Sequence, residues 1–336
     1  MVAKCPTRFL LSKRNNALKI FIVFLLVFTI ILIELSSREL DNTSQAPSVV
    51  TVLHSALYPT EPSNSRRIFF HETSGRGCLS FRQSCTIESA AKHNPLRPIE
   101  LYISADRIND TKPWLGMLRR YGNVAVKLVN NDQFFRASPF RAWYDKGEWR
   151  NSRFKTAHIS DYIRLISLYE SGGFYLDLDY VVLKPLDEKS LHNFLLVEGM
   201  DAKQLNNGVI HFEARHRLVK ELIKFLAAEY DPDDYYLHGP TALTHIYHKL
   251  CASSCADVKV LSHNYFCPIG PPFWHLYFED SSKYSLSLLN NSYGVHMWNF
   301  LSANETIRIG TKQMYAVLAA EHCPVTASHY DDFQLH

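Results

Sequence analysis

The sequence predicts an α/β fold, because short apolar strands alternate with helices along most of its length. Of its 336 residues, 46% are hydrophobic and 21% are charged, a composition typical of folded proteins and unlike that of disordered chains. The sequence shows no internal repeat or low-complexity tract. We therefore expect a mostly parallel sheet in one folded domain of roughly 270 residues.

The expected elements follow one another in a regular order. In the first half of the domain they are a strand at 68–71, a helix at 85–93, a strand at 99–103, a helix at 114–121 and a strand at 124–129. In the second half they are a helix at 157–171, strands at 174–183 and 208–212, and an amphipathic helix at 216–230. Segment 134–149 interleaves aromatic residues with basic ones. We interpret it as a packed aromatic helix pair, in preference to a flap that contacts an acceptor or a membrane.

The amino end has the features of a membrane anchor. Residues 20–33 are an unbroken apolar run, and the residues on either side extend it to the length that a helix needs to cross a bilayer. The bases of the amino end all precede or border this run: Lys4, Arg8, Lys13, Arg14 and Lys19. The positive-inside rule then predicts a cytosolic tail at 1–17, a transmembrane signal anchor at 18–35, a stem at 36–66 and a lumenal domain at 67–336. A cleaved signal peptide is the alternative, but the residues after the run form a poor cleavage site.

The net charge of +3 comes from the amino end alone. Residues 1–19 carry five bases and no acid, so the 36 bases of the chain minus these five leave 31 against 33 acids. A nucleic-acid-binding surface requires a basic excess in the folded part. We therefore expect no nucleic-acid partner.

Cysteines and glycosylation sequons agree with a lumenal domain. Six cysteines follow the anchor: Cys78, Cys85, Cys251, Cys255, Cys267 and Cys323. Fifteen pairings are open to six cysteines, and short separation favours disulfides between Cys78 and Cys85 and between Cys251 and Cys255. Four Asn-x-Ser/Thr sequons begin at Asn42, Asn109, Asn290 and Asn304.

Two charged residues lie in the apolar middle of the helix expected at 157–171. Asp161 and Arg164 are three residues apart and therefore share a helix face. On the surface they would form an ion pair worth about 0.2–0.5 kcal/mol. A buried helix rarely carries two charges without a partner or a function, which favours a functional role for this pair.

A D-x-D motif follows directly. On the expected strand at 174–183, the side chains of Tyr175, Asp177 and Asp179 point to one side, with the carboxylates roughly 6.6 Å apart along the strand. Two hard oxygen ligands at this spacing favour Mg²⁺ or Mn²⁺ over Zn²⁺. Because Gly172 and Gly173 precede the motif without a helix after them, they form a turn and not a phosphate-binding loop.

These motifs resemble the D-x-D sugar-transferase family. The resemblance begins with Ser160-Asp161-x-x-Arg164 and Gly172-Gly173-x-Tyr175-x-Asp177-x-Asp179, and it covers roughly residues 67–302. Further segments are similar to the narrower α1,4-glycosyltransferase group: 69–74, 85–91, Asn207-Gly208-Val209, His238-Gly239-Pro240 and His296-Met297-Trp298-Asn299. His71-Glu72 departs from the Leu-Glu that is more usual at the first strand.

The resemblance implies a GT-A-like fold, a UDP-sugar donor, Mn²⁺ (or Mg²⁺) and retention of anomeric configuration. It implies that Asp177 and Asp179 hold the metal-bound diphosphate as catalytic residues and that His296 completes the metal site. The residues implied to bind the donor are Asp161, Arg164, Tyr175, Asn207 and Trp298.

The function expected on this basis is that of a type II Golgi membrane enzyme. It would transfer Gal or GalNAc from UDP-Gal or UDP-GalNAc in α1,4 linkage to the terminal sugar of a glycolipid acceptor, a glycosphingolipid. One alternative is an α1,4-N-acetylglucosaminyltransferase that acts on glycoprotein glycans. Others are a metal-dependent phosphoesterase, for which we find no second set of metal ligands, and a catalytically silent lectin-like member of the fold.

Overall fold

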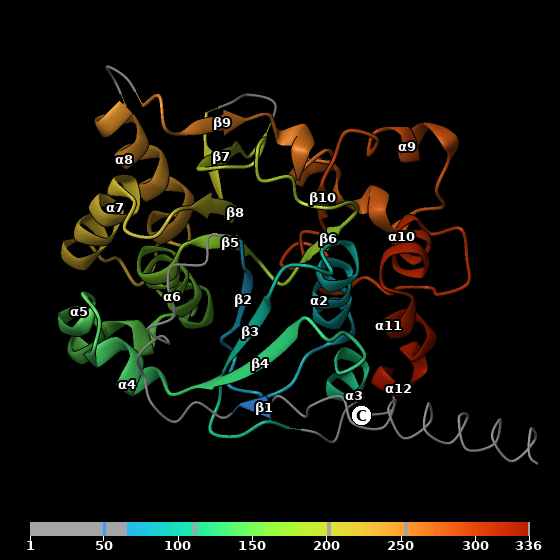
Figure 1. Ribbon diagram of the computed structural model, residues 1–336, viewed down its shortest axis with the longest axis horizontal. Helices are drawn as coiled ribbons and strands as arrows, with labels where there is room; N and C mark the ends of the chain where they lie inside the picture. Colours follow the sequence, from blue (N-terminus) through green and yellow to red (C-terminus); the bar gives the residue numbers. More distant parts are fainter. Residues whose placement is uncertain (1–49, 52–65, 110–112, 200–202, 252–254, 335–336) are drawn as a thin grey trace, which may run out of the picture. The chain divides into compact units, whose positions relative to one another are not determined.

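The computed structural model describes residues 50–51, 66–109, 113–199, 203–251 and 255–334 (Figure 1). The predicted cytosolic tail, the anchor at 18–35 and most of the predicted stem lie outside these residues. Within the described part of the chain, no helix has both the length and the apolar character needed to cross a membrane. The anchor therefore remains a prediction from the sequence.

The centre of the domain is an eight-stranded sheet. Its strands, in spatial order, are β1 (Val50–Thr51), β4 (Val124–Val129), β3 (Ile99–Ser104), β2 (Ile68–Glu72), β5 (Gly173–Leu176), β8 (Leu205–Phe212), β7 (Phe194–Val197) and β9 (Lys259–Leu261). All neighbours pair in parallel except β8, which is antiparallel to both β5 and β7. The expected mostly parallel α/β sheet is thus confirmed, and β1 draws two residues of the predicted stem into it.

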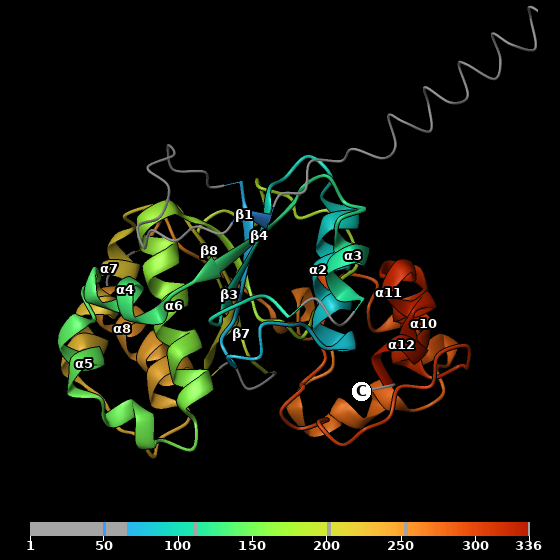
Figure 2. The same ribbon diagram turned by 90° about the horizontal axis from the view of Figure 1, so that it is seen from below.

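Helices cover both faces of the sheet, as Figure 2 shows. One face carries α4 (Asn131–Arg136), α5 (Arg141–Lys146), α6 (Lys155–Ser171), α7 (Arg217–Ala228) and α8 (Ala242–Cys251). The other carries α2 (Phe81–His93), α3 (Trp114–Leu118), α10 (Met314–His322), α11 (Pro324–Ser328) and α12 (Tyr330–Gln334). Successive residues of β2 serve the two layers in turn, since Phe69 packs in one core cluster and Ile68 and Phe70 in the other. Both faces of the sheet are therefore buried.

The aromatic segment at 134–149 forms the packed helix pair that the sequence predicts. Phe135, Phe140 and Trp143 are buried, and the ring of Trp143 stacks on Tyr162 of α6 with a centroid distance of 3.8 Å. These side chains belong to the core beneath α4 and α5. They offer no flap surface.

The chain order reverses direction between β2 and β5. β3 and β4 lie on one side of β2, whereas β5 and all later strands of the sheet lie on the other. Ligands of open α/β sheets bind beyond the carboxyl ends of the strands at such a reversal. β2 and β5 pair through Phe69 and Tyr175, so the D-x-D motif leaves the sheet at this position.

The expectation of one strand over 174–183 is wrong. β5 ends at Leu176, Leu178 and Asp179 form a turn, and the chain resumes as β6 (Tyr180–Val182). β6 belongs to a separate two-stranded sheet with β10 (Gly294–His296). The two aspartates consequently lie in a loop, and the spacing of a straight strand does not apply to them. Pairing with β10, which lies more than a hundred residues along the chain, leaves no local sequence signal.

Several other bounds differ by a few residues. α2 begins at Phe81 and not at 85, because Ser80 forms a capping box with Gln83. α3 ends at Leu118, before the expected 121, and β8 begins at Leu205 rather than 208. At the end of α6, Gly172 has a φ of 67°, and a Cβ there would lie 2.6 Å from the Ala214 nitrogen. Gly172 thus ends the helix as predicted, while Gly173 already belongs to β5.

The disulfides correct one predicted pairing. Cys251 and Cys255 form a disulfide as expected, but Cys85 is joined to Cys323, which is 238 residues away, and Cys78 is a free thiol. The bond links α2 to the residue between α10 and α11, where the two segments pack together. Proximity in sequence predicts only the shorter pairing, because tertiary packing determines the longer one.

A disulfide that closes so long a loop should contribute strongly to stability. We expect the double substitution Cys85→Ala and Cys323→Ala to lower the free energy of unfolding by about 2–5 kcal/mol. Cys251→Ala with Cys255→Ala should cost less, because it opens a short loop. Thermal melts of both variants compare the two effects, and peptide mapping without reduction tests the pairing. A peptide that joins Cys78 to Cys85 would contradict the structure.

Candidate functional site

A pocket of about 260 Å³ collects nearly all of the predicted site residues. Its lining includes Asp161, Arg164, Asp177, Asp179, Asn207, His296 and Trp298. These residues come from α6, the turn after β5, β8, the last residue of β10 and the segment that follows it; Figure 1 shows α6, β5 and β8 beside one another. Tyr175 is 1% exposed and does not line the pocket, but its hydroxyl donates to Asp177, which does. Sequence positions up to 137 residues apart thus meet in one place.

The Arg164 guanidinium links three sides of the pocket. It lies 3.1 Å from Asp161 Oδ1 and 3.0 Å from Asp177 Oδ1, and it donates to the carbonyl oxygen of Asn207 at 2.7 Å. Its side chain is only 5% exposed, and it also lies over the ring of Tyr175. The contact between Asp161 and Arg164 is therefore a buried network, and the interpretation as an isolated surface pair is wrong.

Asp161 is held in place from two directions. Its Oδ1 accepts a hydrogen bond of 2.8 Å from the amide of Asn207, in addition to the contact with Arg164. Burial raises the pKa of Asp161 to about 6, although the charge of Arg164 opposes the shift. The ionised form of Asp161 is thus destabilised by its burial, and such perturbed carboxylates are common at functional sites.

Asp177 is positioned by Tyr175 of the preceding strand and by a glycine. The hydroxyl of Tyr175 donates to its Oδ1, and its own N–H donates to the carbonyl oxygen of Gly208 at 2.7 Å. A Cβ at position 208 would lie only 2.7 Å from Asp177 Oδ2, so a side chain there would displace the carboxylate from its present position. Burial, together with the charge of Asp179, raises the pKa of Asp177 despite the nearby Arg164.

One carboxylate oxygen of Asp179 has two hydrogen-bond partners, and the other has none among the described residues. Its Oδ2 contacts His296 Nε2 at 3.1 Å and accepts from the Asn299 N–H at 3.0 Å. His296 and the Asn299 N–H hold the pKa of Asp179 below its usual value, although burial acts in the opposite direction. Asp179 in turn raises the pKa of His296 well above its usual value, again against the effect of burial. Its Oδ1 is buried without a hydrogen-bond partner among the described residues.

This arrangement fits a divalent cation. A buried carboxylate oxygen without a partner is a site where a cation would compensate the cost of desolvation. Asp179 and His296 would hold such a cation only with the imidazole deprotonated, since metal binding requires the neutral form of histidine. No cluster of three or more His, Cys, Asp or Glu side chains in the described part of the chain is already arranged as a metal site. The ligand set Asp177, Asp179 and His296 thus stays a prediction.

Trp298 and the residues around it close one side of the pocket. Trp298 adopts a left-handed backbone conformation with a φ of 52°, which is rare for a residue with a bulky side chain. Its indole N–H donates to the Ile269 carbonyl oxygen at 2.9 Å, and its ring lies 3.9 Å from that of His296. The strained backbone turns the next residue, Asn299, so that its N–H reaches Asp179.

Arg82 holds this turn, and sequence reasoning missed it. From α2 it donates to Asn299 Oδ1 at 3.1 Å, to Ser302 Oγ at 2.8 Å and to the carbonyl oxygens of Ser302 and Glu305. A single side chain thus connects α2 to the segment that carries the contacts of Asp179. The two segments are more than 200 residues apart, so the sequence offers no signal for this link.

Two pairs of aromatic and apolar residues also line the pocket without having been predicted. They are Tyr235 and Tyr236, from the loop before the π-helical turn Leu237–Thr241, and Phe300 and Leu301, which follow Trp298. They lie next to the motifs His238-Gly239-Pro240 and Trp298-Asn299 in the sequence, and this position could have indicated that they belong to the pocket.

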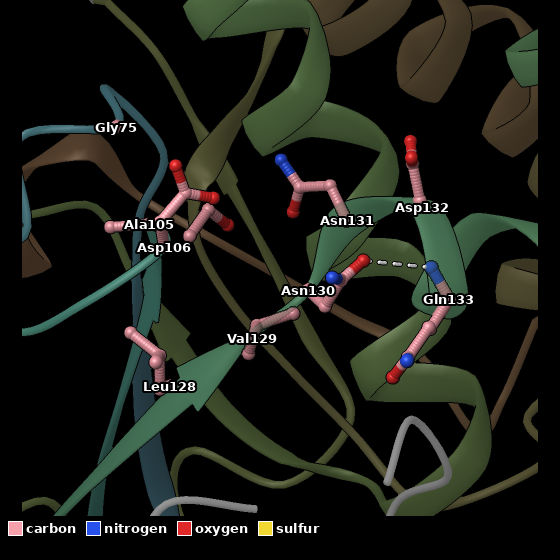
Figure 3. Close-up of a pocket in the computed structure, with 10 residues that line it drawn as sticks. Gly75, Ala105, Asp106, Leu128, Val129, Asn130, Asn131, Asp132 and Gln133 are labelled. Carbon is pink, nitrogen blue, oxygen red and sulfur yellow. Dashed lines mark hydrogen bonds between the residues drawn. The ribbon is translucent and has the colours of Figure 1, made fainter. Parts of the chain in front are cut away.

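A larger cavity of about 520 Å³ lies elsewhere, at the carboxyl ends of β3 and β4 (Figure 3). Its lining includes Ser104, Asp106 and Asn131, and the side chain of Asn130 accepts from the Gln133 N–H at 3.1 Å. It contains none of the predicted site residues. The smaller pocket is therefore the candidate site.

Comparisons with known sequences agree with this pocket. The sequence model of a family described as "Glycosyltransferase sugar-binding region containing DXD motif" matches residues 80–195. A second, described as "Alpha 1,4-glycosyltransferase conserved region", matches residues 211–330. The two matches together include every predicted site residue except Asn207, which lies between them.

Curated relatives cover most of the chain. The chain is 32% identical to lactosylceramide 4-alpha-galactosyltransferase of Rattus norvegicus over 77% of its length and 74% of the relative. It is 30% identical to the Homo sapiens protein of the same name over 80% of its length and 79% of the relative. Alpha-1,4-N-acetylglucosaminyltransferase of Homo sapiens is 27% identical over 79% of this chain and 80% of its own.

Among solved structures, the galactosyltransferase LgtC in complex with donor and acceptor sugar analogs aligns with 78% of this chain and 95% of its own. The TM-score is 0.44 and the identity 14%. A likeness of this degree carries no statement about activity. The D-x-D family match and the mostly parallel sheet are those of a mixed α/β, GT-A-like fold.

Proposed function

The chain belongs to the α1,4-glycosyltransferase family, and from this premise we propose that it transfers Gal or GalNAc from a UDP-sugar, in α1,4 linkage, to the terminal sugar of a glycosphingolipid. The observation that carries the proposal is the network of Asp161, Arg164, Asp177 and Asn207 beside Asp179 in one pocket. A lectin-like protein without activity would not need to bury so many charged groups together, because each is costly to desolvate.

The residues of the pocket have different roles in such a transfer. Cleavage of the bond between sugar and diphosphate develops negative charge on the leaving oxygens and an oxocarbenium-like sugar. Arg164 holds Asp161 and Asp177 in fixed positions, so that Asp161 and the Asn207 amide face the sugar and Asp177 faces the diphosphate without reorganisation during the reaction. We assign no nucleophile.

The proposal includes a divalent cation, Mn²⁺ or Mg²⁺, held by Asp177, Asp179 and His296. When bound, it would supply Lewis-acid stabilisation of the diphosphate. The partnerless Oδ1 of Asp179 supports this assignment. Arg82 then acts as a positioning residue, because it fixes the turn whose Asn299 N–H orients Asp179.

Substitution of Arg82 tests this role. We expect Arg82→Met to raise the Mn²⁺ concentration needed for half-maximal UDP binding by about tenfold or more, the usual cost of losing an outer contact to a metal ligand. Arg97→Met is the matched control, since Arg97 also donates to two backbone carbonyl oxygens but lies outside the pocket. It should lower the melting temperature and leave the Mn²⁺ requirement unchanged. Equal Mn²⁺ requirements in the two variants would contradict the positioning role of Arg82.

We place the enzyme in the Golgi membrane as a single-pass type II protein with its catalytic domain in the lumen. The apolar run at 18–35 and the bases before it support this topology. The two disulfides agree with an oxidising compartment.

An α1,4-N-acetylglucosaminyltransferase that acts on glycoprotein glycans is the second candidate, because a relative of that name aligns with 79% of the chain. Incubation of the full-length protein in detergent with UDP-Gal, UDP-GalNAc and UDP-GlcNAc, each with glycolipid and glycoprotein acceptors, separates the candidates. NMR of the products gives linkage and anomeric configuration. We expect α1,4-linked Gal or GalNAc on a glycolipid. GlcNAc transfer to glycoproteins would favour the second candidate, and an absence of transfer with all pairs would contradict both.

A further inference from the structure

The mouth of the pocket exposes apolar side chains to solvent. Tyr236 is 54% exposed, Phe300 70% and Leu301 44%, and all three line the pocket that contains the aspartates. Tyr235 lies among them, half-buried. Isolated exposed apolar residues are common, but a group of them at the rim of a polar pocket is typical of a binding surface.

Two segments far apart in the chain build this group. The rings of Tyr235 and Phe300 stack with a centroid distance of 5.3 Å and an interplanar angle of 22°. Tyr236 packs edge-on against Tyr235 at 5.1 Å. Phe154 contacts the Tyr235 ring at 5.2 Å, so the stack has a support within the domain. We call Tyr235, Tyr236 and Phe300 the aromatic platform.

The aromatic platform reaches from solvent to the charged floor of the pocket. Tyr235 lines the same pocket as Asp161, Asp177 and Asp179, so its side chain lies on the way from the mouth to the carboxylates. The Tyr235 ring extends from there to Phe300 at the mouth. A ligand on the platform would therefore lie next to the place where the donor sugar is proposed to react.

We propose that the aromatic platform binds the terminal hexopyranose of the acceptor. This inference rests on the proposed function. A pyranose ring has an apolar C–H face and a rim of hydroxyl groups, and aromatic side chains with a polar end, such as Tyr, suit such an amphipathic ligand. The pocket as a whole combines an apolar mouth with a few convergent polar groups, the usual composition of a small-molecule site.

The position of the aromatic platform favours the sugar of a glycolipid, and not its lipid, as the part that binds there. In a transfer reaction the acceptor hydroxyl has to approach the donor carbon to roughly 3–3.5 Å. Because the platform shares its pocket with Asp161 and Asp177, its occupant is the reacting end of the acceptor. A lipid chain at this position would hold the acceptor hydroxyl away from the carboxylates.

Acceptor kinetics test the platform. The donor and acceptor that give the fastest transfer are first identified with the wild-type full-length protein. The acceptor is then used in two forms, as the glycolipid and as its soluble methyl glycoside. We expect Phe300→Ala and Tyr236→Ala to raise the KM for both forms by about tenfold, as the loss of an aromatic contact would, and to leave the Kd for UDP unchanged. Phe300→Tyr should restore the KM.

Phe273→Ala is the matched control, because Phe273 is 49% exposed and does not line the pocket. Its KM values should equal those of the wild type. Acceptor KM values that stay at the wild-type level in folded Phe300→Ala and Tyr236→Ala proteins would overturn the platform. So would an increase confined to the glycolipid form, since this would assign the surface to lipid. Failure of the proposed function is a different result, in which the wild-type protein itself transfers no sugar.

Discussion

Replacement of Asp179 with asparagine should reduce sugar transfer by at least about a hundredfold, in a protein that still folds. A neutral amide is a poor ligand for a hard cation, and loss of stabilisation at the developing charge costs on the order of 10²–10³ in kcat. Initial rates with saturating donor and acceptor measure the effect. A folded Asp179→Asn protein with wild-type rates would remove this residue from the site.

The fold should tolerate this change at a moderate cost. Asparagine keeps one acceptor oxygen for His296 and the Asn299 N–H, so these hydrogen bonds lose their charge assistance, which is worth about 1 kcal/mol for each. Thermal melts therefore have to accompany the rates. Asp187→Asn is the control, because Asp187 is an exposed aspartate that bonds to Ser190 and lies outside the pocket. It should change neither rate nor melting temperature appreciably.

Asp161→Asn should lower the transfer rate by about a hundredfold or more while UDP still binds. Asp161 is positioned against the proposed donor sugar, and misplacement of a reacting centre costs about this much. The contacts proposed for the diphosphate, at Asp177 and Asp179, remain. Initial rates and the Kd for UDP, measured on the same preparation, separate the two effects.

The stability of this variant follows from the partners that Arg164 keeps. Removal of one member of a buried ion pair usually costs about 3–5 kcal/mol. Arg164 retains Asp177 at 3.0 Å and the Asn207 carbonyl oxygen at 2.7 Å, so we expect about 1–3 kcal/mol.

The exposed pair of Arg141 and Asp145 provides the matched control, since it has the spacing of a helical ion pair without burial. Asp145→Asn should cost well under 1 kcal/mol and leave transfer unchanged. Unchanged transfer rates in a folded Asp161→Asn protein would contradict the proposal that Asp161 binds the donor sugar.

The sequence was most informative where local patterns determine structure. Helical spacing ended by Gly172 and Gly173 located α6. Asp161 and Arg164 in its apolar middle indicated the site, because buried charges need partners. Nothing local could show that Arg164 also reaches Asp177, because that contact depends on α6 packing across β5. The family resemblance supplied the candidates from the far end of the chain, His296 and Trp298.

Long-range packing accounts for the features that were missed. β6 leaves the line of β5 to pair with β10, and Cys85 bonds Cys323 because α2 packs beside the carboxyl-terminal helices. The bonds of Arg82 to the turn after Trp298 join the same two regions. Each of these contacts spans more than a hundred residues, a separation at which spacing in one sequence carries no information.

The central claim is that the pocket binds a nucleotide diphosphate through a metal held by Asp177, Asp179 and His296. Calorimetric titration of the full-length protein with UDP, with Mn²⁺ present and again with EDTA, tests it most directly. We predict saturable binding with Mn²⁺ that disappears with EDTA and in the Asp179→Asn variant. UDP binding of equal strength with EDTA, or equal binding by the variant, would contradict the claim.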